Sequence, residues 1–281
     1  MKEIHVDRIT GCVEKLCMDA NYFLNPDIYE SIKSSLDRES SENGRMVLDT
    51  LLKNAEIAKQ ERIAICQDTG MAVVFLEIGQ DVRIVGGNLY DAINEGVRRG
   101  YKKGFLRASV VGHPLNRTNT GDNTPAVIYT DIVEGDKIKI DIAPKGFGSE
   151  NMSAVKMLKP SDGAEGVKEF VVRTVSEAGP NPCPPVIVGV GIGGTMEKAA
   201  LLAKKALLRP ICSVHSDSSI AELEKEILAR INKLGIGPAG LGGNTTALGV
   251  NIEVYPTHIA GLPVAVNIGC HATRHASAII E

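Results

Sequence analysis

The sequence of 281 residues has no tryptophan, and aromatic residues make up only 4% of it. Proteins that bind nucleic acid by stacking need aromatic platforms, and those that bind the phosphate backbone need a basic surface. The formal net charge is −3, and no long basic run occurs. We therefore expect no nucleic-acid partner.

Long apolar runs are missing as well. No stretch approaches the roughly 20 apolar residues that a membrane-spanning helix needs. The opening MKEIHVDRIT has no apolar signal core. These absences favour a cytoplasmic protein that does not contact a membrane.

No two of the six cysteines form a CxxC pair, which is the usual mark of a structural zinc site. In a chain without a signal peptide, most cysteines should be reduced thiols. A single cysteine is more often a small buried hydrophobe than a metal ligand. We expect Cys12 and Cys17, which lie in a predicted helix, and Cys212, which has apolar neighbours, to be such small hydrophobic residues and not ligands.

The length and a hydrophobic content of 43% suffice for a substantial core, arranged as one large domain or as two subdomains. About 60 residues at the start have helical periodicity, and later segments alternate between β-rich runs and amphipathic helices. No repeat or low-complexity linker interrupts them. We predict a mixed α/β (α+β) fold with β-sheets surrounded by helices, and we treat residues 1–281 as a single domain.

Periodicity and turn residues locate the elements. Predicted helices cover residues 41–61, 88–104, 161–179, 195–208 and 219–235. Predicted strands cover residues 71–79, 126–133, 137–144, 184–194, 250–255 and 262–268. The strands at 126–133 and 137–144 flank Glu134-Gly135-Asp136 and are typical of a hairpin. Ser219 and Glu222 have the spacing of a capping box at the start of the last helix.

Four loops at the ends of apolar runs hold the candidate functional residues. The first contains CQDTG, in which Cys66, Gln67 and Asp68 present a thiol, an amide and a carboxylate from one tight turn. The structural alternative is an Asx turn, in which Asp68 accepts a hydrogen bond from the Gly70 N–H. The second loop, APKGFGSEN, forms either a nest of N–H groups for an anion, with Lys145 adding charge, or a plain strand-to-helix turn.

The third loop, NPCPP, holds Cys183 between prolines that stiffen the backbone on both sides. It continues into Gly189, Gly191 and Gly194, which match the GxGxxG dinucleotide fingerprint. The acidic residue expected about 20 positions later is absent, because residues 208–210 are Leu-Arg-Pro. We therefore do not favour dinucleotide binding, although the start of the next helix can accept a carboxylate.

The fourth loop is NIGCHATRH, in which Cys270 is followed by two histidines and an arginine. His258 enters the apolar run that precedes this segment and is a candidate acid or base, although a lone histidine is more often structural. His271 and His275 fit a supporting role beside Cys270 better than a role as ligands.

Five segments, taken in order, resemble one known family: ICQDTG, NTGDNTPA, KGFGSEN, NPCPP with GIGGT, and LPVAVNIGCHATRH. They are similar to the α half of class I iron–sulfur fumarate hydratases, a half that the related L-tartrate dehydratases share. The resemblance covers nearly the whole chain from about residue 40, and the ordered set is far more specific than any one motif.

This resemblance implies a 4Fe–4S cluster bound by Cys66, Cys183 and Cys270. Three thiolates leave one iron without a protein ligand, and that iron would act as a Lewis acid toward a hydroxyl or carboxylate. The resemblance implies acid–base work for Asp68 and places His258 among the residues that contact substrate, and we predict both to be catalytic.

The resemblance also implies that substrate is bound by Gln67, by Arg107 in FLRAS, and by the backbone near Gly146 and Gly148. The family's KGGGS is KGFGS here. This departure changes the shape of the carboxylate-binding loop but keeps its N–H donors.

Single-chain members of the family continue into a second domain, whereas this sequence ends at Glu281. We therefore expect the α subunit of a two-subunit enzyme, with a separately encoded β subunit in an α2β2 assembly. The expected reaction is the reversible hydration of fumarate to (S)-malate, and the alternative is the dehydration of L-tartrate to oxaloacetate. Two rival functions are a nucleotide-dependent oxidoreductase and a non-catalytic iron–sulfur or scaffold subunit.

Overall fold

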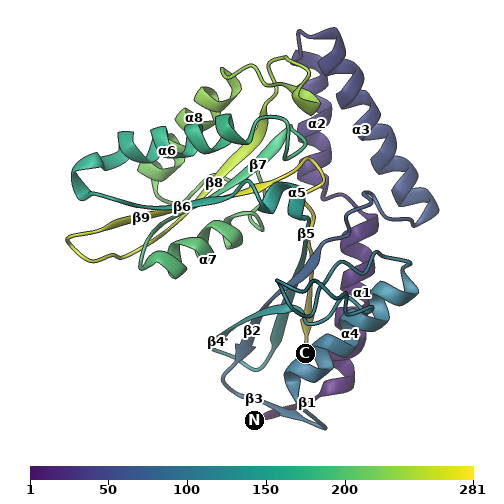
Figure 1. The fold of residues 1–281 in the computed structure, drawn as a ribbon. Coiled ribbons are helices and arrows are strands. Elements are labelled where there is room, and N and C mark those ends of the chain that lie inside the picture. Colours follow the sequence, from purple (N-terminus) through teal and green to yellow (C-terminus); the bar gives the residue numbers. More distant parts are fainter. The chain divides into compact units, whose positions relative to one another are not determined.

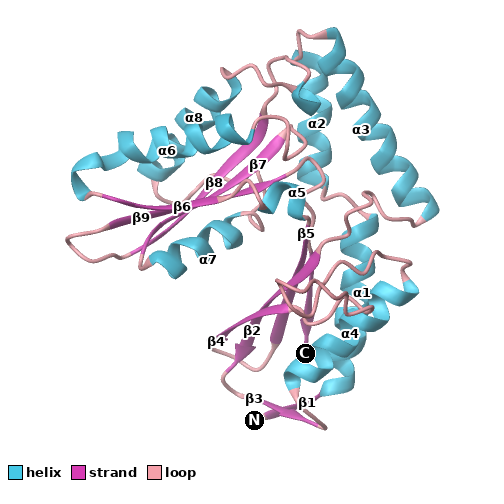
Figure 2. Ribbon diagram, viewed as in Figure 1, coloured by secondary structure: helices cyan, strands magenta, loops and turns pink.

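The computed structural model describes all 281 residues, and its chain divides into two compact units (Figure 1). Unit 1 comprises Met1–Leu24, Ala55–Gly146 and Arg274–Glu281, and unit 2 comprises Asn25–Asn54 and Phe147–Thr273. Helices and sheets occur in both units (Figure 2), so the predicted mixed α/β class is confirmed. No helix combines the length and the apolar character needed to cross a membrane.

Unit 1 is built on a four-stranded sheet with the strand order β10-β5-β2-β4. Its strands are β10 (Ala276–Ile280), β5 (Ile138–Lys145), β2 (Met71–Gly79) and β4 (Val127–Val133). The helices α1 (Val6–Tyr22) and α4 (Leu89–Lys103) pack on one face of this sheet, where alternate residues of β2 such as Val74 and Leu76 join the buried core. A short parallel pair, β1 (Lys2–His5) and β3 (Val82–Val85), completes the unit.

The predicted hairpin of residues 126–133 and 137–144 is wrong, although both strands exist. β2 lies between β4 and β5, parallel to β4 and antiparallel to β5. Most residues of β2 are buried, so this strand takes the central position, while the exposed second half of β4 suits an edge. The turn at 134–136 crosses the end of β2, where the Gly79 N–H donates to the Lys137 carbonyl at 2.8 Å.

Unit 2 contains a second four-stranded sheet, with the order β6-β9-β7-β8. Its strands are β6 (Ala154–Leu158), β9 (Leu262–Gly269), β7 (Val186–Gly193) and β8 (Ala247–Tyr255). The helices α6 (Gly163–Ala178) and α8 (Ser218–Asn232) cover one face, and α7 (Met196–Ala206) covers the other (Figure 1).

The remaining helices complete the chain. α2 (Pro26–Arg38) belongs to unit 2, and α3 (Glu42–Glu61) runs from unit 2 into unit 1. Three short helical turns are α5 (Phe147–Glu150), η1 (Pro160–Asp162) and η2 (Pro238–Gly240). The predicted helices are confirmed, whereas the short strands β1, β3, β6 and β10 were not predicted.

The predicted capping box of α8 is wrong. The N-cap is Asp217, whose carboxylate accepts a hydrogen bond from the Ser219 N–H at 2.8 Å. An aspartate caps a helix as well as a serine does, and its position lets the helix begin at Ser218, one residue earlier than predicted.

Both large sheets have the same strand pattern. In each, the central strand (β2 or β7) has a parallel neighbour on one side (β4 or β8) and an antiparallel neighbour on the other (β5 or β9). The antiparallel neighbour pairs in turn with an antiparallel edge strand, β10 or β6. This repeat is one of topology, which the sequence does not reveal.

The first two glycines of the GxGxxG match serve helix packing. Gly189 and Gly191 lie inside β7, where an added Cβ would come within 2.2 Å of the Ala203 carbonyl oxygen and 2.0 Å of the Ala199 carbonyl oxygen. These oxygens belong to α7, so the helix can approach the strand only because β7 lacks side chains there. Packing therefore explains these two glycines without a dinucleotide.

Gly191→Ala should lower the free energy of unfolding by about 3 kcal/mol, because the new methyl group would overlap the backbone of α7. Urea unfolding followed by circular dichroism measures this change. Gly11→Ala is the control, because nothing lies within 4 Å of the added Cβ in α1, and it should raise stability by about 0.5–1 kcal/mol. Equal tolerance of the two changes would contradict the close packing of α7 on β7.

Candidate active site

The turn Cys66–Gly70 leads into β2 in unit 1. Asp68 Oδ1 accepts a hydrogen bond from the Gly70 N–H at 2.9 Å, so the Asx turn considered as the structural alternative is present. Gly70 has φ +76°, and an added Cβ would lie 2.6 Å from the Lys145 nitrogen, so this position requires glycine. Cys66 Sγ lies 3.4 Å from Gln67 Oε1, and the Gln67 side chain is exposed.

The second carboxylate oxygen of Asp68 faces Gly146. The pairing of Met71 with Lys145 brings the end of β5 beside the start of β2. A Cβ added at Gly146 would lie 3.2 Å from Asp68 Oδ2. Lys145 itself is buried, with its ammonium 3.4 Å from the Gly146 carbonyl oxygen. The half-buried Asp68 side chain thus lies between its own turn and the end of β5.

Arg107 is held beside this turn through its backbone. The Arg107 N–H donates to Thr69 Oγ1 at 2.9 Å, and the Thr69 hydroxyl donates to the Arg107 carbonyl at 3.1 Å. The Arg107 side chain is exposed. A guanidinium with an anchored main chain and an accessible head is suited to bind a ligand carboxylate.

The NTGDNTPA motif forms a loop that reaches the same turn. The Asp122 carboxylate accepts hydrogen bonds from the Thr124 N–H at 3.0 Å and from Arg98 Nε at 2.8 Å. Desolvation raises the pKa of Asp122, but these bonds outweigh it and lower that pKa to about 2. The ionised Asp122 therefore braces the loop that carries Asn123, whose buried amide donates to the Gly70 carbonyl at 3.1 Å.

In unit 2 the antiparallel pairing of β7 with β9 brings Cys183 and Cys270 to one end of the sheet. Ile187 pairs with Gly269, so the loop before β7 adjoins the segment after β9. The Cys183 carbonyl oxygen lies 3.0 Å from His271 Nδ1 and accepts from the His271 N–H at 3.5 Å. Cys183, at φ +56°, is exposed, and Cys270 is half-buried.

The NIGC segment is also tied to the KGFGSEN motif. Asn267 Nδ2 donates to Glu150 Oε2 at 2.7 Å and to Ser153 Oγ at 3.0 Å. Gly148 of the same motif is exposed, and an added Cβ would meet only the Asn181 carbonyl oxygen, at 3.8 Å. Parts of three of the motifs therefore lie together in unit 2.

His258 lies toward the other end of this sheet, in the loop 256–261 that joins β8 to β9. Its exposed ring accepts a hydrogen bond from the Ala260 N–H through Nδ1 at 3.2 Å. The eight residues of β9 separate the loop from Cys270 by about 25 Å, at roughly 3.3 Å per residue. Within unit 2, His258 and the two cysteines therefore do not share a site.

The predicted residues other than His258 fall into two groups. Unit 1 gathers Cys66, Gln67, Asp68, Arg107 and Gly146, and unit 2 gathers Gly148, Cys183 and Cys270. Neither unit by itself collects three His, Cys, Asp or Glu side chains into a metal site. Three further side chains, which were not predicted from the sequence, bind the main chain of the Cys66–Gly70 turn: Tyr101, Asn123 and Arg274. The available signal was that Asn123 and Arg274 stand inside the quoted motifs.

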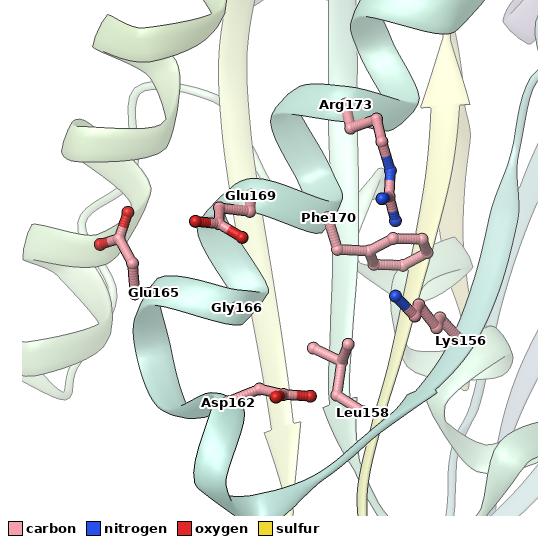
Figure 3. Close-up of a pocket in the computed structure, with 8 residues that line it drawn as sticks. All are labelled: Lys156, Leu158, Asp162, Glu165, Gly166, Glu169, Phe170 and Arg173. Carbon is pink, nitrogen blue, oxygen red and sulfur yellow. The ribbon is translucent and has the colours of Figure 1, made fainter.

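A separate groove of about 310 Å³ lies between α6 and β6 (Figure 3). Its charged side chains are Lys156, Arg173, Asp162, Glu165 and Glu169. Because carboxylates outnumber cations, the groove disfavours a dianionic ligand. None of the predicted site residues lines it.

Comparison with known proteins gives the class of this chain. A family model described as Fumarate hydratase (Fumerase) matches residues 10–279. The "Putative L(+)-tartrate dehydratase subunit alpha" of Methanocaldococcus jannaschii is 46% identical over 275 residues, which cover 96% of this chain and 96% of that protein. The L(+)-tartrate dehydratase subunit alpha of Escherichia coli O157:H7 is 35% identical over 284 residues, which cover 100% of this chain and 93% of that protein.

Hydratases and dehydratases of this kind are hydro-lyases, which add water to a substrate or remove it. The matches place the chain among them. Because the family model covers nearly its whole length, the chain belongs to the fumarate hydratase (Fumerase) family. The resemblance inferred from the five segments is thereby confirmed.

Gly146→Ala should lower the free energy of unfolding by about 1 kcal/mol, because the new methyl group would press on the Asp68 carboxylate. Gly148→Ala is the matched change in the same loop, and its Cβ has room, so its effect should stay within about 0.5 kcal/mol. Chemical denaturation of both variants checks the difference. Identical stabilities would mean that Asp68 does not lie against Gly146.

Proposed function

We propose that this chain is the α subunit of an iron–sulfur hydro-lyase that reversibly hydrates fumarate to (S)-malate. The observation that carries the proposal is the match of a fumarate hydratase model to residues 10–279. The relatives named as α subunits support a separately encoded β subunit, and we propose an α2β2 assembly.

A second candidate is the dehydration of L(+)-tartrate to oxaloacetate. The observation that favours it is that the relatives compared above carry the name of tartrate dehydratase. Tartrate and malate are both four-carbon dicarboxylates and differ by one hydroxyl group. A site that binds both carboxylates therefore suits either substrate, and discrimination depends on the groups around that one hydroxyl.

The donor chemistry of three thiols fits a 4Fe–4S cluster. Cys183 and Cys270 occupy adjoining loops of unit 2, and Cys66 begins the turn that carries Asp68. When bound, the cluster would supply an iron without a protein ligand, which is a Lewis acid for the hydroxyl and the neighbouring carboxylate of malate. The chain passes from one unit to the other after Gly146 and after Thr273, inside two of the motifs that supply these residues.

The other three cysteines suit the cluster less well. Burial raises the pKa of the Cys17 thiol, and burial also raises the pKa of the Cys12 thiol. Thiolates bind metal and neutral thiols do so poorly, so these two positions oppose ligation. Cys212 is exposed and lies outside the motifs.

The protein groups around Asp68 perform the remaining work. Asp68 removes the C3 proton of malate during dehydration and returns it during hydration. The Arg107 guanidinium binds a substrate carboxylate, and Gln67 with the N–H groups near Gly146 and Gly148 orients the dicarboxylate. A catalytic His258 would have to act with groups outside unit 2, because β9 separates it from the cysteines of that unit.

The proposed function is tested by assaying this chain with its β subunit under anaerobic conditions. The complex should hydrate fumarate with a kcat/KM about tenfold or more above that for tartrate dehydration, and the chain alone should turn over neither substrate, since the pocket needs its second half to exclude water. A tartrate preference would replace fumarate by the second candidate. Turnover by the isolated chain at the rate of the complex would contradict the subunit proposal.

Replacing any one of Cys66, Cys183 or Cys270 by serine should abolish both bound iron and turnover, because each supplies one of three protein anchors. Cys212→Ser is the control and should keep both. Iron analysis and visible absorbance of anaerobic samples measure the cluster independently of activity. Retention of the full iron content by one of the three variants would remove that cysteine from the ligand set.

A further inference from the structure

Three consecutive main-chain carbonyls of the Cys66–Gly70 turn accept hydrogen bonds from three buried side chains, and the Gly70 carbonyl is approached by two of them, because the Tyr101 hydroxyl also lies 3.3 Å from it. The pairs are Arg274 with the Asp68 carbonyl at 2.6 Å, Tyr101 with the Thr69 carbonyl at 2.7 Å, and Asn123 with the Gly70 carbonyl at 3.1 Å. The exposed fractions of these donors are 4%, 2% and 0%. We name Arg274, Tyr101 and Asn123 the carbonyl clamp.

The clamp side chains come from three separate parts of unit 1, and each is anchored. Tyr101 lies near the end of α4, within the core. Arg274, just before β10, donates through Nε to Asn21 Oδ1 at 3.2 Å, and Asn21 is bonded to the backbone of α1. Asn123, at φ +60°, accepts from the Ser109 N–H at 2.8 Å. Through the clamp, the main chain of the Cys66–Gly70 turn is therefore bonded to α4, to the loop that carries Asn123, and through Arg274 and Asn21 to α1.

All three donors carry their protons around neutral pH. A guanidinium does not lose its proton in proteins, and an amide does not titrate. Burial raises the pKa of the Tyr101 phenol, so the hydroxyl stays a donor. The clamp is a permanent set of donors matched to three acceptors.

The clamp fixes the main chain on which the Asp68 carboxylate is carried. The Asp68 carboxylate accepts a hydrogen bond from the Gly70 N–H through Oδ1, and its Oδ2 lies where a Cβ added at Gly146 would come within 3.2 Å of it. Proton transfer needs the acid or base within hydrogen-bond reach of the reacting carbon's proton, and a displacement of about 1 Å can cost about 10²-fold in rate.

We propose that Arg274, Tyr101 and Asn123 are positioning residues, which hold the carboxyl group of Asp68 in the direction required for proton transfer by binding the carbonyls of its turn. This proposal rests on the proposed role of Asp68 in a hydro-lyase. It assigns a purpose to the arginine of NIGCHATRH and to the asparagine of NTGDNTPA, neither of which the proposed mechanism uses.

Tyr101→Phe removes only the hydroxyl, which donates to the Thr69 carbonyl at 2.7 Å and lies 3.3 Å from the Gly70 carbonyl oxygen. In the α–β complex, kcat should fall about 10- to 100-fold with KM changed less than about twofold and with the iron content unchanged. Tyr22→Phe is the matched control, because it deletes a hydroxyl that donates to another backbone carbonyl of unit 1, that of Gly104, at 3.1 Å. Its kcat should stay at the value of the unmodified protein.

A second pair of variants allows the proposal to be tested even if the Tyr101→Phe protein does not fold. Asn123→Asp keeps the acceptor for the Ser109 N–H but replaces the donor to Gly70 by an oxygen, and kcat should fall as in Tyr101→Phe. Asn94→Asp makes the same exchange at a side chain that accepts from the Ala126 N–H and donates to the Tyr90 carbonyl, and it should leave kcat unchanged.

Hydrogen exchange at the Gly70 N–H, followed by NMR on the full chain, reads the clamp without any cluster or substrate. This N–H is bonded to Asp68 Oδ1, so it should exchange about 5- to 100-fold faster in Tyr101→Phe and Asn123→Asp, and at the original rate in the two controls. Unchanged exchange in both clamp variants would overturn the proposal.

The decisive comparison combines a clamp variant with Asp68→Asn, which by itself should lower kcat about 10²–10⁴-fold. If the clamp acts through Asp68, adding Tyr101→Phe to Asp68→Asn should cause no further loss. Multiplied losses, or loss of iron in the single clamp variants, would show a general structural role and overturn the proposal. A complex that turned over neither fumarate nor tartrate would overturn the proposed function instead, and the exchange rates would still report whether the clamp holds the turn.

Discussion

In both large sheets, the antiparallel neighbour of the central strand ends where the central strand begins. β5 ends at Lys145 opposite Met71 of β2, and β9 ends at Gly269 opposite Ile187 of β7. The turn that precedes each central strand therefore adjoins the residues that follow its antiparallel neighbour. The approach of the Asp68 side chain to Gly146 and the contact of the Cys183 loop with His271 are two instances of this one constraint. A slip of one residue in either ladder would turn the paired side chains to the opposite face of the sheet. The residues that now lie next to each other at the ends of these strands would then be separated.

The charges gathered around the Cys66–Gly70 turn suit an anionic ligand. Asp68 is accompanied by Lys145, Arg107 and Arg274, of which Arg107 is exposed and the other two are buried. An excess of cationic side chains favours an anionic ligand and raises its local concentration. In the groove between α6 and β6, carboxylates outnumber cationic side chains. The charges therefore favour the Cys66–Gly70 turn over this groove as the site of an anionic ligand, in agreement with the motifs.

The sequence predicted elements well where the signal is local and poorly where it depends on pairing. The strand at 71–79 and the helices were recognised from periodicity, because the burial that causes the pattern lies within each segment. The hairpin failed because a short turn between two β-rich segments does not tell whether a third strand is inserted between them, and only the burial of β2 decides this. Gly189 and Gly191 match a dinucleotide-binding fingerprint, but these positions are glycine because α7 packs directly against the backbone of β7.

The candidate site shows the same division between local and distant signals. The stiff loops at Cys66, Cys183 and Cys270 were visible in the sequence, because proline, glycine and polar residues are local signals. The clamp was not visible, because Tyr101 is distant from the turn in sequence and looks like any core aromatic. The separation of His258 from Cys270 could have been predicted, because the predicted strand at 262–268 lies between them and β9 fills that interval in the structure.

Holding a carboxylate through its main chain has a physical advantage over holding it through its own oxygens. Each hydrogen bond made to a carboxylate oxygen stabilises the charged form and occupies a lone pair that proton transfer requires. A hydrogen bond made to a neighbouring carbonyl restrains the same side chain and leaves those lone pairs to the turn and the substrate. The carbonyl clamp places a buried guanidinium, a phenol and an amide on three successive carbonyls, and the cost of burying these polar groups is offset by pairing every one of them. Rigidity at the Asp68 turn thus arises from the packing of α1, α4 and the 122–125 loop, which lie outside the candidate active site itself.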